Sequence, residues 1–225
     1  MDSYQCINGA SKDRENALAN PRVRSIVRVP IILGNGHKAR SEIISFGNLS
    51  DHGEHFAVRF EGSDTKAPLV RLHSECITGD ALASARCDCG PQLQEALQHL
   101  HREGGLLLYL RQEGRGIGLY RKLEAYLLQD QGLDTYAANR ALGHKDDERS
   151  YQVAADMLEA LGIQTIRLLS NNPDKQKQLT MAGITVESRI PTGVFVDADN
   201  RHYLETKVKH SRHSIDVPPV QKEIP

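Results

Sequence analysis

The chain has 225 residues, and its 28 Lys and Arg against 29 Asp and Glu give a formal net charge of −1. This near-neutral balance argues against a protein that coats nucleic acid by bulk electrostatics. No window approaches the ~18 consecutive apolar residues of a membrane helix, and residues 1–20 lack the apolar segment of a secretory signal. We therefore expect a cytoplasmic protein without a membrane or nucleic-acid partner.

The N-terminal third of the chain reads as a lead-in followed by short strands. Residues 1–20 are polar and aperiodic, and we interpret them as flexible. Runs rich in Val, Ile and Phe then alternate with Gly, Asn, Asp and Pro, as in strands joined by turns. These runs cover residues 23–33, 42–46, 55–61 and 69–72. Their close succession predicts an antiparallel strand region.

Helical periodicity begins later and alternates with further strands. A leucine repeat predicts a helix between Pro91 and Gly104. Further helices are expected up to Gly132, over 150–162 and after Pro173, and strands over 106–110, 165–169 and 184–190. This order predicts an α/β (α+β) fold, with a mixed β-sheet covered by helices and an antiparallel N-terminal strand region. We expect one domain over 21–207, between the lead-in and a flexible tail over 208–225.

Three of the four cysteines lie close together, at Cys76, Cys87 and Cys89. In a chain of this length without a secretory signal, they do not indicate a disulfide framework. Three thiols can turn toward one soft metal such as zinc, which prefers four tetrahedral ligands. Three protein ligands and an open fourth position are typical of catalytic zinc. Two alternatives stay open: a closed structural site with His73 or another side chain as fourth ligand, and buried cysteines without a metal.

Two strand ends carry groups that can hold phosphate. The stretch 111–118, Arg-Gln-Glu-Gly-Arg-Gly-Ile-Gly, precedes a helix, where backbone N–H groups, the helix dipole and arginines favour an anion. A solvated turn with surface arginines is the alternative. The stretch 170–175, Ser-Asn-Asn-Pro-Asp-Lys, offers a hydroxyl, amides and a lysine, although capping of the next helix is the commoner use.

For two other residues, their positions in the sequence favour a structural role over a catalytic one. Asp147 stands just before the helix over 150–162, where the helix dipole alone favours acidic residues. Tyr126 falls on an apolar helix face, so core packing is its default interpretation. The other members of that face are Leu119, Leu123 and Leu127.

Taken in order, these motifs resemble the GTP cyclohydrolase II family over roughly residues 23–207. The resemblance is carried by Arg-Leu-His-Ser-Glu-Cys at 71–76, Gly-Asp at 79–80, Arg-Cys-Asp-Cys-Gly at 86–90, the stretch 111–118, and Ser-Asn-Asn-Pro at 170–173. It implies conversion of GTP to formate, pyrophosphate and 2,5-diamino-6-(5-phosphoribosylamino)pyrimidin-4(3H)-one, the first step of riboflavin biosynthesis. It also implies one zinc per subunit, Mg²⁺ on the triphosphate, and a homodimer.

The resemblance gives roles to residues that the patterns alone leave open. The zinc ligands match the three clustered cysteines. The nucleotide contacts match Arg71, Leu72, His73, Ser74, Glu75, Gln92, Glu113, Gly114, Arg115, Thr135, Ser170 and Lys175. The general base matches Asp147, the proposed nucleophile Arg149, and a tyrosine tied to ring opening Tyr126. We expect Arg149 to clamp the α-phosphate instead, because a guanidinium stays protonated and has no free lone pair.

Three features refine the comparison with the family. Ser170 stands where threonine is usual, and its hydroxyl is expected to preserve binding. Relatives with methionine in place of Tyr126 stop at the formylated pyrimidine, so we expect the deformylated product here. The segment before Cys76 is too short for a 3,4-dihydroxy-2-butanone 4-phosphate synthase domain, so we expect the monofunctional form.

Three alternatives to this function are open. The same first step can feed a specialised metabolite pathway instead of riboflavin. A zinc-stabilised nucleotide-binding module without catalysis is a second alternative, although Asp147, Arg149 and Tyr126 are all retained. An RNA-binding zinc protein needs stacking aromatics on a basic face, whereas the four Phe and seven Tyr are spread along the chain.

Overall fold

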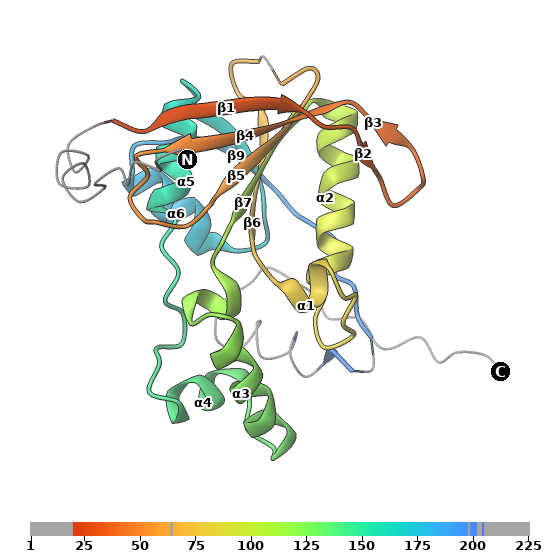
Figure 1. Cartoon of the computed structure of the whole chain (residues 1–225), viewed down its shortest axis with the longest axis vertical. Coiled ribbons are helices and arrows are strands. Elements are labelled where there is room, and N and C mark those ends of the chain that lie inside the picture. Colours follow the sequence, from red (N-terminus) through yellow and green to blue (C-terminus); the bar gives the residue numbers. More distant parts are fainter. Residues whose placement is uncertain (1–19, 64, 198, 202–203, 205–225) are drawn as a thin grey trace, which may run out of the picture.

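The computed structural model describes residues 20–63, 65–197, 199–201 and 204 (Figure 1). In this part of the chain, seven strands form one sheet in the order β1-β4-β5-β7-β6-β8-β9. Their bounds are β1 Arg22–Arg28, β4 Ser41–Gly47, β5 Phe56–Phe60, β6 Leu69–Ser74, β7 Gly105–Leu110, β8 Thr165–Leu169 and β9 Thr185–Ile190. The short strands β2 (Ile31–Ile32) and β3 (Lys38–Ala39) pair separately. The expected tail, and the lead-in up to residue 19, lie outside the described residues.

The sheet is mixed, as predicted. β1, β4, β5 and β7 are antiparallel neighbours, whereas β7, β6, β8 and β9 run parallel. The prediction that residues 69–72 belong to the antiparallel region is wrong. These residues lie in β6, which pairs in parallel with β7 and β8 and does not pair with β5. The single strand expected over 23–33 is split into β1 and β2 next to Pro30, which has no N–H for a sheet hydrogen bond.

Helices cover both faces of the sheet. Helix α2 (Cys89–Glu103) lies on one side, and α5 (Gln152–Ala160) and α6 (Pro173–Met181) lie on the other (Figure 1). Side chains alternate along β7: Leu108 packs in the core with α5, and Leu107 packs in the core with α2. This arrangement leaves the strand ends free to build a site.

Two further helices stand away from the sheet at one end of the molecule. They are α3 (Leu119–Asp130) and α4 (Thr135–Ala141), drawn in green in Figure 1. α4 and the short helix α1 (Ile77–Asp80) were not predicted. Asp134 caps α4 by accepting hydrogen bonds from the backbone of Tyr136 and Ala137. Because α3 does not pack on the sheet, its expected apolar face is wrong: Leu123 is 44% and Leu127 is 65% exposed.

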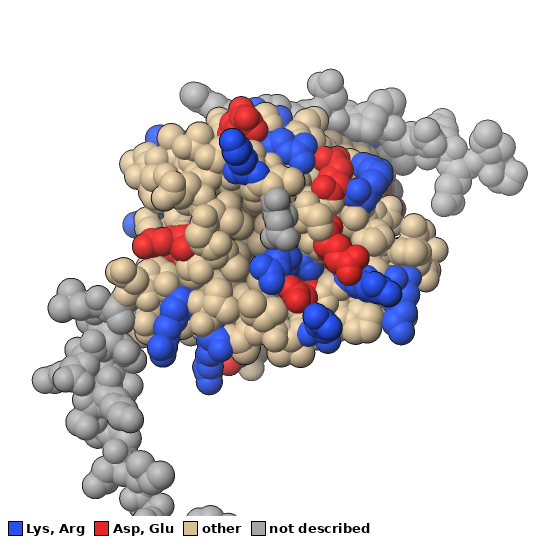
Figure 2. All heavy atoms as spheres, turned by 90° about the horizontal axis from the view of Figure 1, so that it is seen from above, with Lys and Arg blue, Asp and Glu red and all other residues tan. Residues whose placement is uncertain are grey.

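Charges of both signs are mixed on the molecular surface. In the view of Figure 2, basic and acidic side chains lie beside one another. Arg59 on β5, for example, pairs with Glu42 on β4 at 2.6 Å. Within the described residues, none of the helices has the length and apolarity needed to cross a bilayer.

Candidate active site

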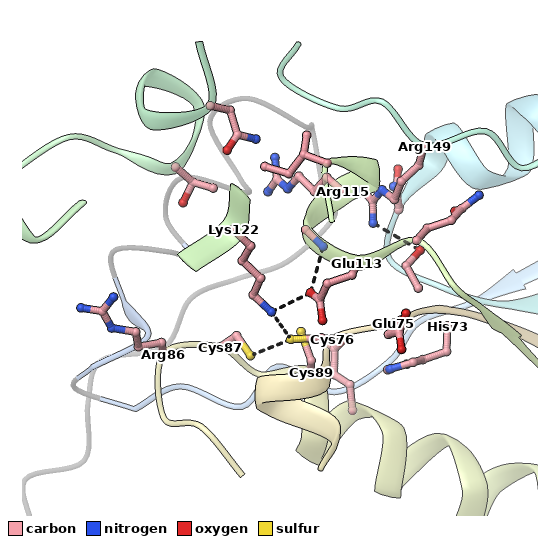
Figure 3. Close-up of a pocket in the computed structure, with 18 of the residues that line it drawn as sticks. His73, Glu75, Cys76, Arg86, Cys87, Cys89, Glu113, Arg115, Lys122 and Arg149 are labelled. Atoms are coloured by element: carbon pink, nitrogen blue, oxygen red, sulfur yellow. Dashed lines mark hydrogen bonds and ion pairs between the residues drawn. The ribbon is translucent and has the colours of Figure 1, made fainter. Parts of the chain in front are cut away.

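The site lies where the carboxyl ends of the parallel strands meet. β6, β7, β8 and β9 share one direction, so the segments that follow them gather at one edge of the sheet, where open α/β sheets bind ligands. All predicted site residues except Leu72 and Asp147 line one pocket there (Figure 3). The residues brought together are Arg71, His73, Ser74, Glu75, Cys76, Cys87, Cys89, Gln92, Glu113, Gly114, Arg115, Tyr126, Thr135, Arg149, Ser170 and Lys175.

The three cysteines face one another beside α1 and the start of α2. Their Sγ atoms all lie within 4.8 Å of each other, and those of Cys76 and Cys87 are 3.6 Å apart (Figure 3). Two sulfurs bound at ~2.3 Å to a tetrahedral zinc lie ~3.8 Å apart. The donor set and its spacing therefore fit a zinc ion.

Two glycines make room for this cluster. A Cβ on Gly79 would lie 2.9 Å from Cys87 Sγ and 3.3 Å from Cys76 Sγ. A Cβ on Gly90 would lie 2.4 Å from the carbonyl oxygen of Gly79. Any larger residue at either position would push the loop apart, so both glycines are required for the sulfurs to converge.

The cysteines differ in their ionisation. Hydrogen bonds with the Cys87 and Cys89 thiols lower the pKa of Cys76 well below its usual range, and the charge of Lys122 acts in the same direction. The bond shared with Cys76 raises the pKa of Cys87 to about 11. Metal ligation requires thiolates, so binding of an ion at this cluster would release the protons that the thiols hold.

His73 belongs to a neighbouring buried hydrogen-bond group. Its Nε2 lies 3.0 Å from both carboxylate oxygens of Asp80, which also accepts hydrogen bonds from Cys76 N–H at 3.1 Å and from the Tyr109 hydroxyl at 2.8 Å. Burial lowers the pKa of His73, so the ring is neutral. Among the residues that the structure describes, the metal-binding group contains the three cysteines and not His73. The arrangement favours an open site over a site closed by His73.

The glycine-rich stretch forms a tight turn after β7, with a 3₁₀ helix η2 at Glu113–Gly116. Gly114, Arg115 and Gly116 have positive φ angles of 62°, 65° and 97°. Glu148 N–H donates to the Arg115 carbonyl at 3.0 Å. This contact holds the turn against the segment that carries Arg149, so two arginines reach one pocket.

Glu113 uses its carboxylate to join three parts of the site. Its Oε2 accepts a hydrogen bond from Ile77 N–H at 2.7 Å. Its Oε1 accepts bonds from Gly114 N–H at 2.9 Å and from Lys122 Nζ at 2.8 Å. Glu113 therefore ties the glycine-rich turn to α1 and α3, in addition to lining the pocket.

Arg149 and Asp147 form a pair at the pocket wall. Arg149 Nε donates to Asp147 Oδ1 at 2.9 Å, and a second guanidinium nitrogen bonds Oδ2. Burial alone would raise the pKa of Asp147, but hydrogen bonds from Arg149 outweigh it, and the pKa lies below its usual range. Arg149 also approaches Ser74 Oγ at 3.5 Å. Asp147 does not line the pocket itself and reaches it through Arg149.

Tyr126 lines the pocket, so its expected place in the core is wrong. It lies on the inner face of α3, formed by Lys122, Ala125, Tyr126 and Gln129. This face is turned toward the cysteines and not toward the sheet. Burial raises the pKa of the phenol, which therefore stays protonated at neutral pH. Arg86, next to Cys87, lies against the Tyr126 ring.

The turn after β8 combines capping with a place in the pocket wall. Asn172 Oδ1 accepts a hydrogen bond from Asp174 N–H at 2.9 Å and caps α6, which confirms the capping interpretation. Ser170 and Lys175 nevertheless line the pocket. Lys175 Nζ donates to the Leu72 carbonyl at 2.8 Å, whereas the Leu72 side chain is buried in the core. Leu72 thus contributes its backbone to this region.

Arg71 and Gln92 are joined across β6 and α2. Arg71 donates to Gln92 Oε1 at 3.1 Å, and Gln92 Nε2 donates to Asp88 at 2.7 Å. Arg71 Nε, His73 Nδ1 and Gln112 Oε1 are buried without a partner among the described residues. Because buried polar atoms are nearly always hydrogen-bonded, this pocket wall has capacity for a polar ligand.

Several pocket residues were not predicted. Those outside the predicted site residues are Arg86, Gln112, Ile117, Lys122, Ala125, Gln129, Asn139, Asn171, Asn172 and Thr192. Helical spacing offers a signal for some of them, because Lys122 and Gln129 are four before and three after Tyr126 on one helix face. Thr192 follows β9, the fourth strand whose carboxyl end meets this edge.

Comparisons with known proteins match the chain to one family. The sequence model of the GTP cyclohydrolase II family matches residues 33–191. Proteins named GTP cyclohydrolase-2 from Psychromonas ingrahamii and Vibrio cholerae are each 48% identical to this chain, covering 85% and 84% of it and 96% of each relative. The protein of that name from Salmonella typhimurium is 50% identical, covering 76% of this chain and 88% of the relative.

Proposed function

We propose that this chain, which belongs to the GTP cyclohydrolase II family of enzymes, opens the imidazole ring of GTP and releases C8 as formate. The other products are pyrophosphate and 2,5-diamino-6-(5-phosphoribosylamino)pyrimidin-4(3H)-one, in the first step of riboflavin biosynthesis. The observation that carries the proposal is a group of three thiols in the wall of a cation-lined pocket. A closed structural zinc has four protein ligands, whereas three are typical of a catalytic zinc.

The donor set is suited to one zinc ion per subunit, held by Cys76, Cys87 and Cys89. When bound, the ion supplies a water of near-neutral pKa, which a poor electrophile such as guanine C8 requires. Asp80 supports this arrangement by holding the backbone N–H of Cys76. Arg71, His73 and Gln112 line the pocket, and each has a buried polar atom without a partner among the described residues, which supports a polar ligand there.

Cations of the pocket support binding of the triphosphate end. Arg115, Arg149 and Lys175 line the pocket and can stabilise the charge that develops when the bond between the α- and β-phosphates breaks. Mg²⁺ is expected to arrive on the triphosphate. We assign Arg149 to electrostatic clamping, because its pairing with Asp147 favours the protonated guanidinium. A nucleotidyl adduct on Arg149, trapped during turnover and found by mass spectrometry, would contradict this assignment.

Tyr126 supports the complete reaction. Its protonated phenol lies in the same pocket as the cysteines and is a hydrogen-bond donor for the opened ring. We therefore expect the deformylated pyrimidine as the product. Accumulation of the formamido compound would contradict this expectation.

We further propose a cytoplasmic homodimer without nucleic-acid or membrane partners. Tyr120, Leu123 and Leu127 expose apolar side chains on α3, as in a face covered by a second copy. The net charge of −1 supports the absence of a nucleic-acid partner. Sedimentation analysis tests the oligomer, and a monomer at assay concentrations would contradict it.

Incubation of the zinc-loaded protein with GTP and Mg²⁺, followed by mass identification of the products, tests the activity. Formate and pyrophosphate in equal amounts support the proposal. Binding of GTP without turnover would support the non-catalytic alternative, and release of GDP would indicate a simple phosphatase. A pathway to a specialised metabolite would use the same step, so this assay tests only the reaction. Complementation of a riboflavin auxotroph by the gene for this chain tests the pathway.

A further inference from the structure

The inner face of α3 carries a buried charge. Lys122, Ala125, Tyr126 and Gln129 follow helical spacing and line the pocket. The Lys122 side chain is only 11% exposed. Burial of an ammonium is costly unless its donors are all paired, so its partners indicate its role.

All three donors of the Lys122 ammonium are used in hydrogen bonds around the cysteine loop. Its Nζ donates to Cys76 Sγ at 3.1 Å, to Thr78 Oγ1 at 2.9 Å and to Glu113 Oε1 at 2.8 Å; Figure 3 shows the sulfur and carboxylate contacts. An ammonium has three donors, and each has an acceptor. Lys122 therefore has no donor left for a nucleotide, and its contacts point to the metal ligand Cys76.

The ammonium is charged in this environment. The Glu113 carboxylate, 2.8 Å from Nζ, and the sulfur of Cys76, 3.1 Å from it, both favour the charged ammonium. A hydrogen bond from a cation to a thiolate withdraws charge from the sulfur. Three thiolates around a divalent ion leave a net negative charge, which weakens the ion as a Lewis acid.

We propose that Lys122 is a positioning residue of the metal site, which fixes Cys76 Sγ at the metal and reduces the electron donation of this thiolate. The reduced donation would make a bound metal ion a stronger Lewis acid. This last consequence rests on the proposed function. The contact with Cys76 does not, and it can be tested without GTP.

The test uses Co²⁺ as a spectroscopic probe in place of zinc. In Lys122→Met, the sulfur-to-cobalt charge-transfer band is expected to move to longer wavelength, because the thiolate regains electron density. The zinc dissociation constant, measured by competition with a chelator, is expected to rise about 10- to 100-fold. Lys122→Arg keeps a charged donor, so its band is expected between those of the wild type and Lys122→Met.

Arg121→Met is the matched control. It removes the neighbouring cation on α3, which pairs with Glu124 at 2.6 Å at the surface, and its band should coincide with the wild-type band. A Lys122→Met band at the wild-type wavelength would overturn the inference, even if GTP turnover is confirmed. If Lys122→Met does not fold, Lys122→Gln replaces it, because glutamine keeps a neutral donor. A shift of its charge-transfer band to longer wavelength, smaller than that expected for Lys122→Met, supports the inference. A band at the wild-type wavelength overturns it. A shifted band in a protein that does not turn over GTP would leave the inference standing and contradict only the proposed function.

Discussion

The guanidinium carbon of Arg86 lies 4.7 Å from the centroid of the Tyr126 ring. Arg86 also forms an ion pair with Asp130 at the end of α3. Because Arg86 directly precedes Cys87, these contacts tie the cysteine loop to the helix that carries Tyr126. The cysteines and the phenol are therefore positioned by one another, although they are separated in the sequence.

Substitution of Arg86 by Ala is expected to lower kcat about two- to fivefold, which corresponds to the ~0.5–1 kcal/mol of an exposed cation–π contact. Zinc content should not change, since Arg86 is not a ligand. Steady-state kinetics and metal analysis measure both. Arg121→Ala removes a surface ion pair with Glu124 on α3, the helix that carries Tyr126, and should leave kcat unchanged. Equal losses in the two variants would contradict a specific role for Arg86.

Gly79→Ala is expected to abolish stoichiometric zinc binding. The added Cβ would lie 2.9 Å from Cys87 Sγ, so the sulfurs would have to separate. Gly47→Ala is a suitable control, because its Cβ would meet no atom closer than 3.7 Å. Metal analysis of both purified proteins checks the prediction. Full zinc occupancy in Gly79→Ala would show that the loop can relax without loss of the site.

Arg115 stores backbone strain at the site, since it is a non-glycine residue with a φ of 65°. Arg115→Gly and Arg115→Ala both remove the side chain, including its stacking on Tyr136. The Gly variant is expected to be more stable than the Ala variant by about 1 kcal/mol in urea unfolding, because only Gly adopts this conformation without strain. Both should bind GTP more weakly than the wild type. Equal stability of the two variants would contradict the strain.

The Asp147 carboxylate is expected to titrate below its usual pKa because of Arg149. Because the pKa of Asp147 is lower in the folded state, the pair with Arg149 stabilises the folded protein at pH values above the unfolded-state pKa. This stabilisation is lost as the pH falls through the folded-state pKa. ¹³C NMR of the carboxyl carbon should therefore show the pKa of Asp147 rising in Arg149→Met. An unchanged pKa in that variant would assign the shift to another group.

Much of the fold was predictable because β-branched runs and leucine repeats directly mark strands and helices. Sequence-based prediction was wrong where contacts between elements distant in the sequence determine the structure. Nothing local to β6 shows that β7 inserts between it and β5, and this insertion makes β6 parallel to its neighbours. The leucines of α3 obey helical spacing, yet α3 leaves the sheet, so Leu127 is exposed.

The site shows the same division. Cys76, Cys87 and Cys89 were predictable as a group because thiols are rare and their chemistry is specific. Lys122 was not, because a lysine on a helix is usually solvated and only the folded chain places it on Cys76 Sγ. Helical spacing alone places Tyr126 in the core, because periodicity identifies a helix face without saying what lies opposite; the family resemblance is what indicated the site.

The most direct test of the account follows the carbon that the reaction removes. GTP labelled with ¹³C at C8 is incubated with the zinc-loaded protein and Mg²⁺, and ¹³C NMR records the position of the label. We predict that the label appears as free formate, in an amount equal to the pyrophosphate released. A label that stays in a purine, or in a formylated pyrimidine, would contradict the account.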